Sequence, residues 1–365
     1  MPPWNTTDAA LHDPSLAPAV WALTLGLVMG GLVAVSGSVC NLGAVAVLLK
    51  EASRRRSRQL MVVTADSILL LQLAVVDLLY CSVTLPLLMA TYLQPQFHPP
   101  AFCAAAGFIR IANSNVEFNT LGLVALERFY NIKRGRSSGG LFSVRLTRLY
   151  CSGLWVLALG FQLPFIRTGQ YGFNERTHRC DIMVGWWTRC ALVMGEAVLP
   201  LAVILTCYLA ILRQVRRSKA LMAKYMDGHH PRSSGEEGGL VRRYRVASRT
   251  LLGLVILYAV CILPIVVLNI AGEFGRWKEV GIVFHCFYWL QYIANTLIYV
   301  MSNVRYRMAL RGFLRGIFAS RKANKKRITA IEWDHFNSSY NIKKSIDSEI
   351  AITFNKDHCK NHIRY

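Results

Sequence analysis

The chain alternates between long apolar blocks and short charged connectors. Each block holds about 20 or more residues, enough to cross the hydrocarbon core of a bilayer as a helix. The pattern predicts helices over seven stretches: 20–49, 62–93, 101–133, 144–166, 189–218, 241–271 and 280–303. We therefore predict an all-α membrane protein, a seven-transmembrane helix bundle followed by a C-terminal amphipathic helix.

The third block is unusual because charged residues interrupt it. Arg110 and Glu117 lie in its interior, where a charge costs about 2.5–3.5 kcal/mol on insertion scales and therefore faces protein or a wet cavity. Their spacing from Cys103, Ser114 and Arg128 places all five residues on one helix face. We expect this face to look into the bundle, with the third helix at its centre.

Basic residues are concentrated in four segments on one side of a seven-pass chain. Segments 50–58, 128–148, 213–249 and 305–364 hold 5, 6, 10 and 14 of the 42 Lys and Arg residues. The positive-inside rule assigns them to the cytoplasm and leaves the N-terminus on the outer side. We expect a multi-pass protein of the plasma membrane with an extracellular N-terminus. The net charge of +22 therefore reports topology rather than nucleic-acid binding.

The same pattern divides the chain into parts. We predict an extracellular tail over 1–19, the bundle over 20–303, a membrane-surface helix over 304–318 and a disordered cytoplasmic tail over 319–365. Between helices we expect a basic loop over 50–58, a polar outer loop over 167–188 and a flexible linker over 219–240. Clusters of Arg beside membrane ends attract anionic inner-leaflet lipid, at about 1 kcal/mol per charge. Asn5 begins a glycosylation sequon.

No catalytic signature is present in the sequence. There is no nucleophile elbow, no HExxH and no Gly-rich phosphate loop, so we expect no enzyme and no resident cofactor. The 10 cysteines are scattered without a CxxC pair, and His229-His230 stands alone, so we expect no metal site either.

One mark on each helix matches a known family. The marks are Asn41, Leu73 to Asp77, Cys103 with Cys180, Glu127-Arg128-Phe129, Trp155, Pro200 with Tyr208, Pro264 and Asn295 with Tyr299. With them the chain resembles the rhodopsin-like (class A) G-protein-coupled receptors over about 20–318. Leu78 to Cys81 and Ala112 to Asn115 resemble the medium-chain fatty-acid receptor and its melatonin-receptor relatives. The resemblance implies a receptor that binds an extracellular small molecule, acidic or lipid-like, and activates a heterotrimeric G protein.

The resemblance also implies roles for single residues. It pairs Cys103 with Cys180 in a disulfide that pins the outer loop over the cavity. The family's positions imply a ligand pocket lined by Arg110, Ser114, Glu196, Asn269, His285 and Trp289. They imply a sodium site at Asp77, Asn113, Glu117 and Asn295. They imply a G-protein switch at Glu127, Arg128, Tyr208 and Tyr299.

Two charge questions stay open at this point. Arg110 anchors an acidic group of the ligand or pairs internally with Glu196, and a zwitterionic ligand bridging both is the next alternative. Asp77 and Glu117 are two acids close together, so they hold a cation, share a proton, or join a water-filled polar network.

Three residues depart from the family pattern. Phe129 replaces the usual Tyr, Thr296 replaces the Pro of N-P-x-x-Y, and Ile262 stands where Trp is usual. The base of helix six lacks its usual acid, and we expect Asp66 to be solvated. The closed state then depends on Glu127 and packing alone, which implies basal activity. The alternatives are a seven-helix binding protein with atypical or constitutive signalling and, less favoured, a transporter or channel, against which the lack of an internal repeat argues.

Overall fold

The computed structural model describes residues 18–57, 64–93, 99–134, 140–174, 177–226, 252–271 and 276–302, and parts of 306–315. The elements below belong to one compact unit, Met1–Arg307. The predictions for Asn5, most of the N-terminal tail, residues 227–240 of the linker and the tail after residue 318 lie outside the described residues. So does most of the surface helix predicted over 304–318.

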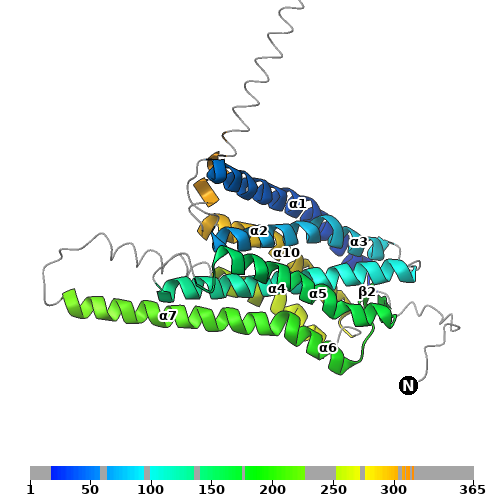
Figure 1. Cartoon of the computed structure of the whole chain (residues 1–365). Helices are drawn as coiled ribbons and strands as arrows, with labels where there is room; N and C mark the ends of the chain where they lie inside the picture. Colours follow the sequence, from blue (N-terminus) through cyan, green and yellow to red (C-terminus); the bar gives the residue numbers. More distant parts are fainter. Residues whose placement is uncertain are drawn as a thin grey trace, which may run out of the picture. The chain divides into compact units, whose positions relative to one another are not determined.

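Seven long helical segments make up the described part of the bundle (Figure 1). They are, in chain order, α1 (Val20–Ser57), α2 (Ala65–Leu79) continued by η2 (Tyr80–Thr84) and α3 (Leu85–Leu93), α4 (Pro100–Arg134), α5 (Val144–Arg167), α6 (Trp186–Val193) continued by η3 (Met194–Val198) and α7 (Leu199–Met226), Leu252–Ala271 with η4 (Tyr258–Ile262) and α9 (Leu263–Ala271), and α10 (Lys278–Ser302). The prediction of a seven-helix, all-α protein is confirmed.

Five of these segments are long and apolar enough to cross a membrane by themselves. Among the described helices, α4 and α10 fall outside that group, and both carry buried polar side chains, including Glu117 and Asn295. Both helices lie inside the bundle against several neighbours, so their polar residues face protein rather than lipid.

Three of the described helical segments contain a π-helical turn, and one residue separates the end of each turn from a proline. The π-helical stretches η2, η3 and η4 end just before Leu85-Pro86, Leu199-Pro200 and Leu263-Pro264. Proline has no backbone N–H and its ring presses on the carbonyl four residues earlier, so the helix widens locally instead of breaking. Before Pro86, for example, η2 is a wide turn within a continuous segment from Ala65 to Leu93.

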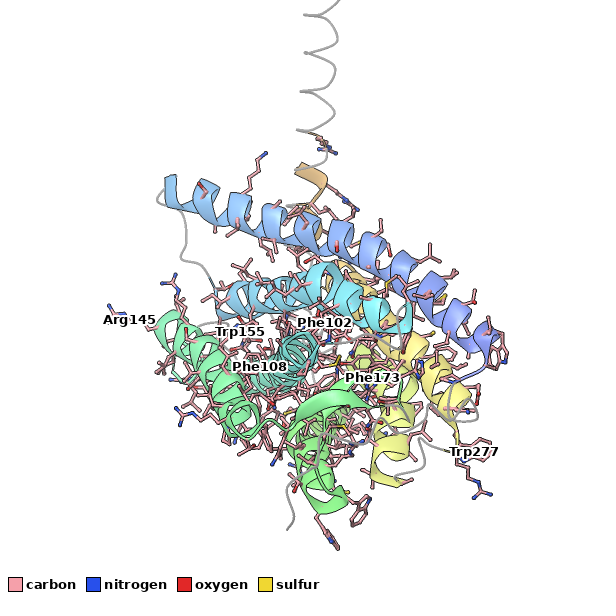
Figure 2. The ribbon with its side chains drawn as sticks, turned by 90° about the vertical axis from the view of Figure 1, so that its right-hand side faces the viewer. Phe102, Phe108, Arg145, Trp155, Phe173 and Trp277 are labelled. Carbon is pink, nitrogen blue, oxygen red and sulfur yellow. A yellow bond between two sulfur atoms is a disulfide. The ribbon has the colours of Figure 1, made fainter. Side chains whose placement is uncertain are left out.

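Helix α4 occupies the centre of the bundle, as its polar stripe predicted. It packs against α2, α5 and α7 and both strands of the outer hairpin. Figure 2 shows it in the middle of the bundle, where the figure labels Phe108. Trp155 of α5 packs with Val76 and Val116, whereas Trp277 projects outward. Among the described residues Trp289, Tyr80, Tyr258 and Tyr292 are the largest fully buried side chains.

Three predicted connectors differ in the structure. Residues 50–57 of the basic loop continue α1 as a helix, because Lys, Glu and Arg favour helices once the chain has left the membrane. Helix α7 likewise extends through Met226 into the predicted linker. The polar outer loop contains an antiparallel hairpin, β1 (Tyr171–Asn174) and β2 (Arg179–Ile182).

The hairpin covers the outer end of α4. Its register pairs Phe173 with Cys180, and Cys180 forms the expected disulfide with Cys103 of α4. Phe102 and Phe173 pack around this bond (Figure 2). All four residues of β2 are buried, so the loop is part of the protein interior rather than a solvated connector.

Gly107 permits the close approach of the hairpin to α4. A Cβ atom at residue 107 would lie 2.7 Å from Cδ1 of Tyr171. The ring cannot easily move, because the Tyr171 hydroxyl donates to Gln162 Oε1 at 2.5 Å. We therefore expect Gly107→Val to lower the melting temperature by an overpacking cost of about 1–3 kcal/mol. Gly153→Ala is the control, since residue 153 faces open space; equal melting of the two variants would contradict this packing.

Candidate functional site

A small cavity opens under the hairpin at the outer end of the bundle. Its volume is about 100 Å³, and five of the six residues assigned to the ligand pocket line it: Arg110, Ser114, Glu196, Asn269 and His285. Trp289 does not belong to this lining. Its side chain is fully buried in the hydrophobic core, so the structure does not bring Trp289 to this cavity, although its neighbour Tyr288 lines it.

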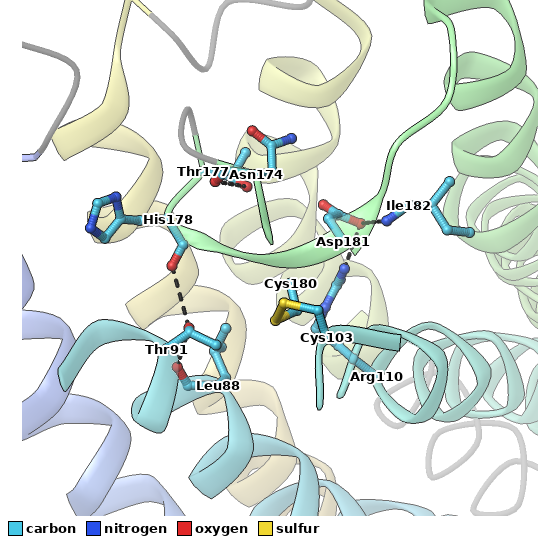
Figure 3. The surroundings of a disulfide bond; sticks show 10 residues. All are labelled: Leu88, Thr91, Cys103, Arg110, Asn174, Thr177, His178, Cys180, Asp181 and Ile182. Carbon is cyan, nitrogen blue, oxygen red and sulfur yellow. Dashed lines mark hydrogen bonds and ion pairs between the residues drawn. A yellow bond between two sulfur atoms is a disulfide. The ribbon is translucent and has the colours of Figure 1, made fainter. Parts of the chain in front are cut away.

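The counter-charge of Arg110 is Asp181, a residue of the hairpin. Arg110 Nη2 donates to Asp181 Oδ1 at 2.6 Å (Figure 3). Arg179 donates to Oδ2 of the same carboxylate, from Nε at 3.3 Å and from Nη2 at 3.2 Å. No ion pair joins Arg110 to Glu196 within the described residues. The alternative of an internal pair with Glu196 is therefore not seen, and Arg110 is paired with a residue that the sequence did not indicate.

One carboxylate thus serves two buried guanidinium groups. Burial alone would raise the pKa of Asp181, but Arg110 and Arg179 outweigh it and hold that pKa well below its usual range. Burial and the nearby Arg110 lower the pKa of Arg179. Keeping Arg179 charged therefore costs free energy. A second anion near the cluster would offset this cost.

His285 completes the polar wall as an acceptor. Its Nδ1 lies 2.7 Å from the carbonyl oxygen of Gly281 and must donate to it. The other ring nitrogen, Nε2, is then free to accept from Nη1 of Arg179, which it contacts. Because this arrangement uses the neutral imidazole, His285 adds no positive charge to the cavity.

The charges around the cavity do not balance. Its described lining includes Arg110, Arg179 and Arg189 against Asp181 and Glu196. Within the described residues, Glu196 makes no ion pair or hydrogen bond. The lining therefore carries an excess of one positive charge, concentrated on the side of the hairpin.

A chain of hydroxyl groups runs inward from the cavity. Ser114 Oγ and the Tyr288 hydroxyl are 2.9 Å apart, and the Tyr288 and Tyr292 hydroxyls are also 2.9 Å apart. Tyr292 stacks on Tyr80 with ring centroids 3.7 Å apart. The outer cavity is thus connected by side chains to the middle of the bundle.

Three of the four residues predicted to form the ion site meet at mid-bundle. Asn295 Nδ2 lies 3.3 Å from Asp77 Oδ2 and 3.2 Å from Glu117 Oε1, and all three side chains are buried. Glu117 Oε2 and Asn295 Oδ1 have no hydrogen-bond partner among the described residues. Asn113 instead donates to the Val76 carbonyl at 3.2 Å and ties α4 to α2.

Thr296, one of the departures from the family pattern, has a structural role. Its hydroxyl donates to Asn41 Oδ1 at 2.6 Å, and Asn41 Nδ2 donates to the Tyr292 carbonyl at 2.8 Å. Proline at residue 296 could not make the first of these bonds. The substitution therefore joins α1 to α10 beside the mid-bundle acids.

The inner end of α4 carries an ion-pair cluster. Arg128 Nη2 contacts Asp66 Oδ1 at the start of α2, and Arg128 Nε lies 3.8 Å from Glu127 Oε2. Asn131 Nδ2 donates to Glu127 Oε1 at 2.5 Å. The expectation that Asp66 is solvated is wrong, and Arg128 does not depend on Glu127 alone. Tyr208 is half-buried against the core, and the side chain of Tyr299 lies outside the described residues.

Sequence reasoning missed Arg179, Asp181, Tyr288 and Asp66. Arg179 and Asp181 flank Cys180 in sequence, so a disulfide that holds Cys180 over the cavity also places these two residues at the cavity. Asp66 begins α2 where the antiparallel α4 ends, which places it level with Arg128. Tyr288 lies three residues after His285 and four before Tyr292, on one face of α10.

Comparison with known proteins agrees with this architecture. Residues 40–299 match the 7 transmembrane receptor (rhodopsin family) model. The chain is 21% identical to the G-protein coupled receptor moody of Drosophila melanogaster, over 90% of this chain and 58% of that protein. It is 32% identical to the G-protein coupled receptor 84 of Bos taurus, over 44% of this chain and 39% of that protein.

The chain spans less than two thirds of the length of these relatives. It is also 21% identical to the allatostatin-A receptor of Bombyx mori over 77% of each chain. The family match covers most of the chain and agrees with the expectation of a receptor rather than an enzyme. Together with the seven helical segments, it shows that this multi-pass membrane protein belongs to the rhodopsin family of seven-transmembrane receptors.

Proposed function

We propose that the chain is a plasma-membrane receptor that binds a small extracellular molecule with an acidic group and promotes nucleotide exchange on a heterotrimeric G protein. The observation that carries the ligand class is the sharing of Asp181 by Arg110 and Arg179. A guanidinium pairs bidentately with a carboxylate, and a buried guanidinium needs a counter-charge. A ligand carboxylate would neutralise the excess positive charge of the cavity.

The proposed anchor is the Arg110 side of the cluster. Arg110 Nε is buried and has no hydrogen-bond partner among the described residues. A second acceptor could therefore join Asp181 at this guanidinium without displacing it. The cavity of about 100 Å³ admits only a small group, so a longer ligand requires the hairpin or the helices around it to separate.

A zwitterionic ligand is the second candidate. Glu196 lines the same cavity without an ion pair or hydrogen bond in the described part of the chain. A molecule with a carboxylate at Arg110 and an ammonium at Glu196 would form an ion pair with each of these residues. Glu196→Gln distinguishes the two: it weakens a zwitterion and strengthens or spares a simple acid.

We assign the G-protein switch to the inner cluster of Asp66, Glu127 and Arg128. Both acids hold Arg128 against the ends of α2 and α4. Release of Arg128 from these acids would free its guanidinium for a cytoplasmic partner. Tyr208 and Tyr299 are proposed to join this change, as the family resemblance implies.

For the mid-bundle acids we propose a sodium ion or a shared proton. Orphaned oxygens of Glu117 and Asn295 lie beside Asp77, and such oxygens are ligands for a hard cation. We expect Glu117→Ser to change the dependence of the melting temperature on sodium concentration. The control is potassium at the same ionic strength. If wild type and variant respond alike to sodium, the coupling of Asp77 and Glu117 is wrong.

The disulfide and the basic segments support a proposed orientation in the membrane. A disulfide persists in an oxidising compartment, so the hairpin end is proposed to be extracellular, together with the N-terminus. The basic segments 50–58 and 213–249 of the sequence would then lie on the cytoplasmic side, beside anionic lipid.

The test is nucleotide exchange by several purified G proteins with the receptor in lipid nanodiscs. Small carboxylic acids are compared with their primary amides, which have the same shape and no charge. We expect the acids, and not the amides, to stimulate exchange by the wild-type receptor, and we expect this stimulation to be lost in Arg110→Gln. Equal stimulation of nucleotide exchange by acids and amides would contradict the proposal that the ligand is acidic. Exchange no faster than without receptor would favour an uncoupled binding protein, and ligand-independent ion flux in liposomes would favour a channel.

A further inference from the structure

A second cavity lies between α4, α5 and the α6–η3 segment. Its volume is about 370 Å³, within the range of about 300–1,000 Å³ that is typical of small-molecule sites. It is distinct from the outer cavity, but Leu192 and Glu196 line both. These two residues therefore form a common wall between the two spaces.

The lining of this second cavity has an apolar, membrane-facing side. Val156, Leu157 and Phe161 of α5 are 69%, 70% and 54% exposed in a helix that spans the bilayer. Gly160 and Gly195 form the hollow, because a Cβ atom at either residue would meet nothing within 4 Å. The absence of side chains at these two residues leaves room for an aliphatic chain.

Polar groups line the inner side of the same space. Asn119 Nδ2 donates to the Asn115 carbonyl at 2.9 Å and to Asn115 Oδ1 at 3.2 Å. In the described part of the chain, Asn115 Nδ2, Asn119 Oδ1 and the Glu196 carboxylate have no hydrogen-bond partner. Unpaired polar groups at membrane depth are costly, so they favour an occupant that carries hydrogen-bonding groups.

Charge selects among the possible occupants. Glu196 is the ionisable residue of the cavity lining, and its carboxylate would repel an anionic head group. On the other side of the common wall, Arg110 and Arg179 already supply positive charge. A cationic head group without a carboxylate of its own would be repelled across this wall by those guanidinium groups. An uncharged hydroxyl, in contrast, can donate to Glu196 and exchange hydrogen bonds with Asn115 and Asn119.

We propose that this cavity is a second ligand site, which takes a neutral single-chain lipid with a hydroxyl-bearing head group from the membrane. The chain lies along Val156, Leu157 and Phe161, and the hydroxyl lies against Glu196 and the two asparagines. Occupancy of the site acts on the outer cavity through the common wall of Leu192 and Glu196.

The experiment is photolabelling of the purified receptor in phosphatidylcholine nanodiscs. The probe is a monoacylglycerol with a diazirine in its chain, and labelled peptides are identified by mass spectrometry. Labels are expected in 156–161 and 191–196. Gly160→Leu fills the hollow and is expected to reduce labelling about tenfold. Gly153→Leu is the matched control, because residue 153 lies two helical turns away on the same face of α5 and also faces open space.

Head-group recognition is read with competitors of the same chain length. The unlabelled monoacylglycerol should compete about tenfold better than its di-O-methyl ether or the free fatty acid. In Glu196→Leu the three lipids should compete equally well. Equal labelling of the Gly160→Leu and Gly153→Leu variants, or equal competition by all three lipids, would overturn the proposal. Binding is measured without a G protein, so this result does not depend on the function proposed above.

Discussion

Asp181→Asn should be the most destabilising single substitution at the outer cavity. It leaves Arg110 and Arg179 buried side by side without their shared carboxylate. Removing one partner of a buried ion pair costs about 3–5 kcal/mol. For a bundle of this size the melting temperature should fall by about 10 °C. The measurement is thermal unfolding of purified wild-type and variant receptor at matched protein concentration.

Two further variants separate charge from packing in this prediction. Arg110→Gln leaves Asp181 paired with Arg179 and should cost less than Asp181→Asn. The double variant Arg110→Gln with Asp181→Asn keeps the net charge of the wild-type cluster and should regain part of the lost stability. A double variant that melts at the sum of the two single losses would show that the charges do not interact.

The pH dependence of this contribution follows from the lowered pKa of Asp181. A carboxylate with a lowered pKa in the folded state contributes stability that is fully present above its unfolded pKa of about 3.9. That stability is lost as the pH falls through the lower pKa of the folded state. The difference in melting temperature between wild type and Asp181→Asn should therefore stay constant between about pH 5 and 8.

Asp66→Asn should raise ligand-independent nucleotide exchange. It removes one of the two acids that hold Arg128 at the inner end of α4. Because both side chains of this pair are 20% exposed, we expect an effect of about 1 kcal/mol rather than that of a fully buried pair. This corresponds to an increase of about fivefold in the active fraction. Initial rates of exchange on purified G protein measure it.

The matched variant for this test is Asp66→Glu, which keeps the acid. It should stay closer to wild type than Asp66→Asn. Exchange by Asp66→Asn at or below the wild-type rate would mean that Asp66 does not hold the inactive state. Basal activity was inferred because helix six lacks the acid that usually holds Arg128. Asp66 supplies a second acid instead, so this reason for basal activity no longer applies, and the basal activity itself stays a prediction.

The periodic part of the structure was predictable because helix geometry is local. The stripe from Cys103 to Arg128 placed α4 at the centre, since charged residues spaced at three and four must share an inward face. The disulfide also followed from family resemblance. The extension of α1 to Ser57 could not be predicted, because a hydrophobic block indicates the length of the membrane span and not the length of the helix.

Contacts made by the outer hairpin could not be predicted. Asp181 lies 71 residues after Arg110, and its position depends on the register of β1 and β2 and on the bond at Cys180. Helical phase likewise gives only an approximate direction for a side chain: Tyr288 lines the cavity, whereas its neighbour Trp289 is buried in the core. The pairing of Asp66 with Arg128 required the relative height of two antiparallel helices.

In the proposed function, the Arg110–Asp181–Arg179 cluster recognises an acidic ligand and the receptor then activates a G protein. The most direct measurement compares carboxylate-stimulated nucleotide exchange by wild type and by the double variant Arg110→Gln with Asp181→Asn, after both are shown to be folded by thermal unfolding. We expect wild type to respond to a carboxylate and not to its amide, and we expect the double variant to lose this response. An undiminished response of the folded double variant would contradict the proposed function.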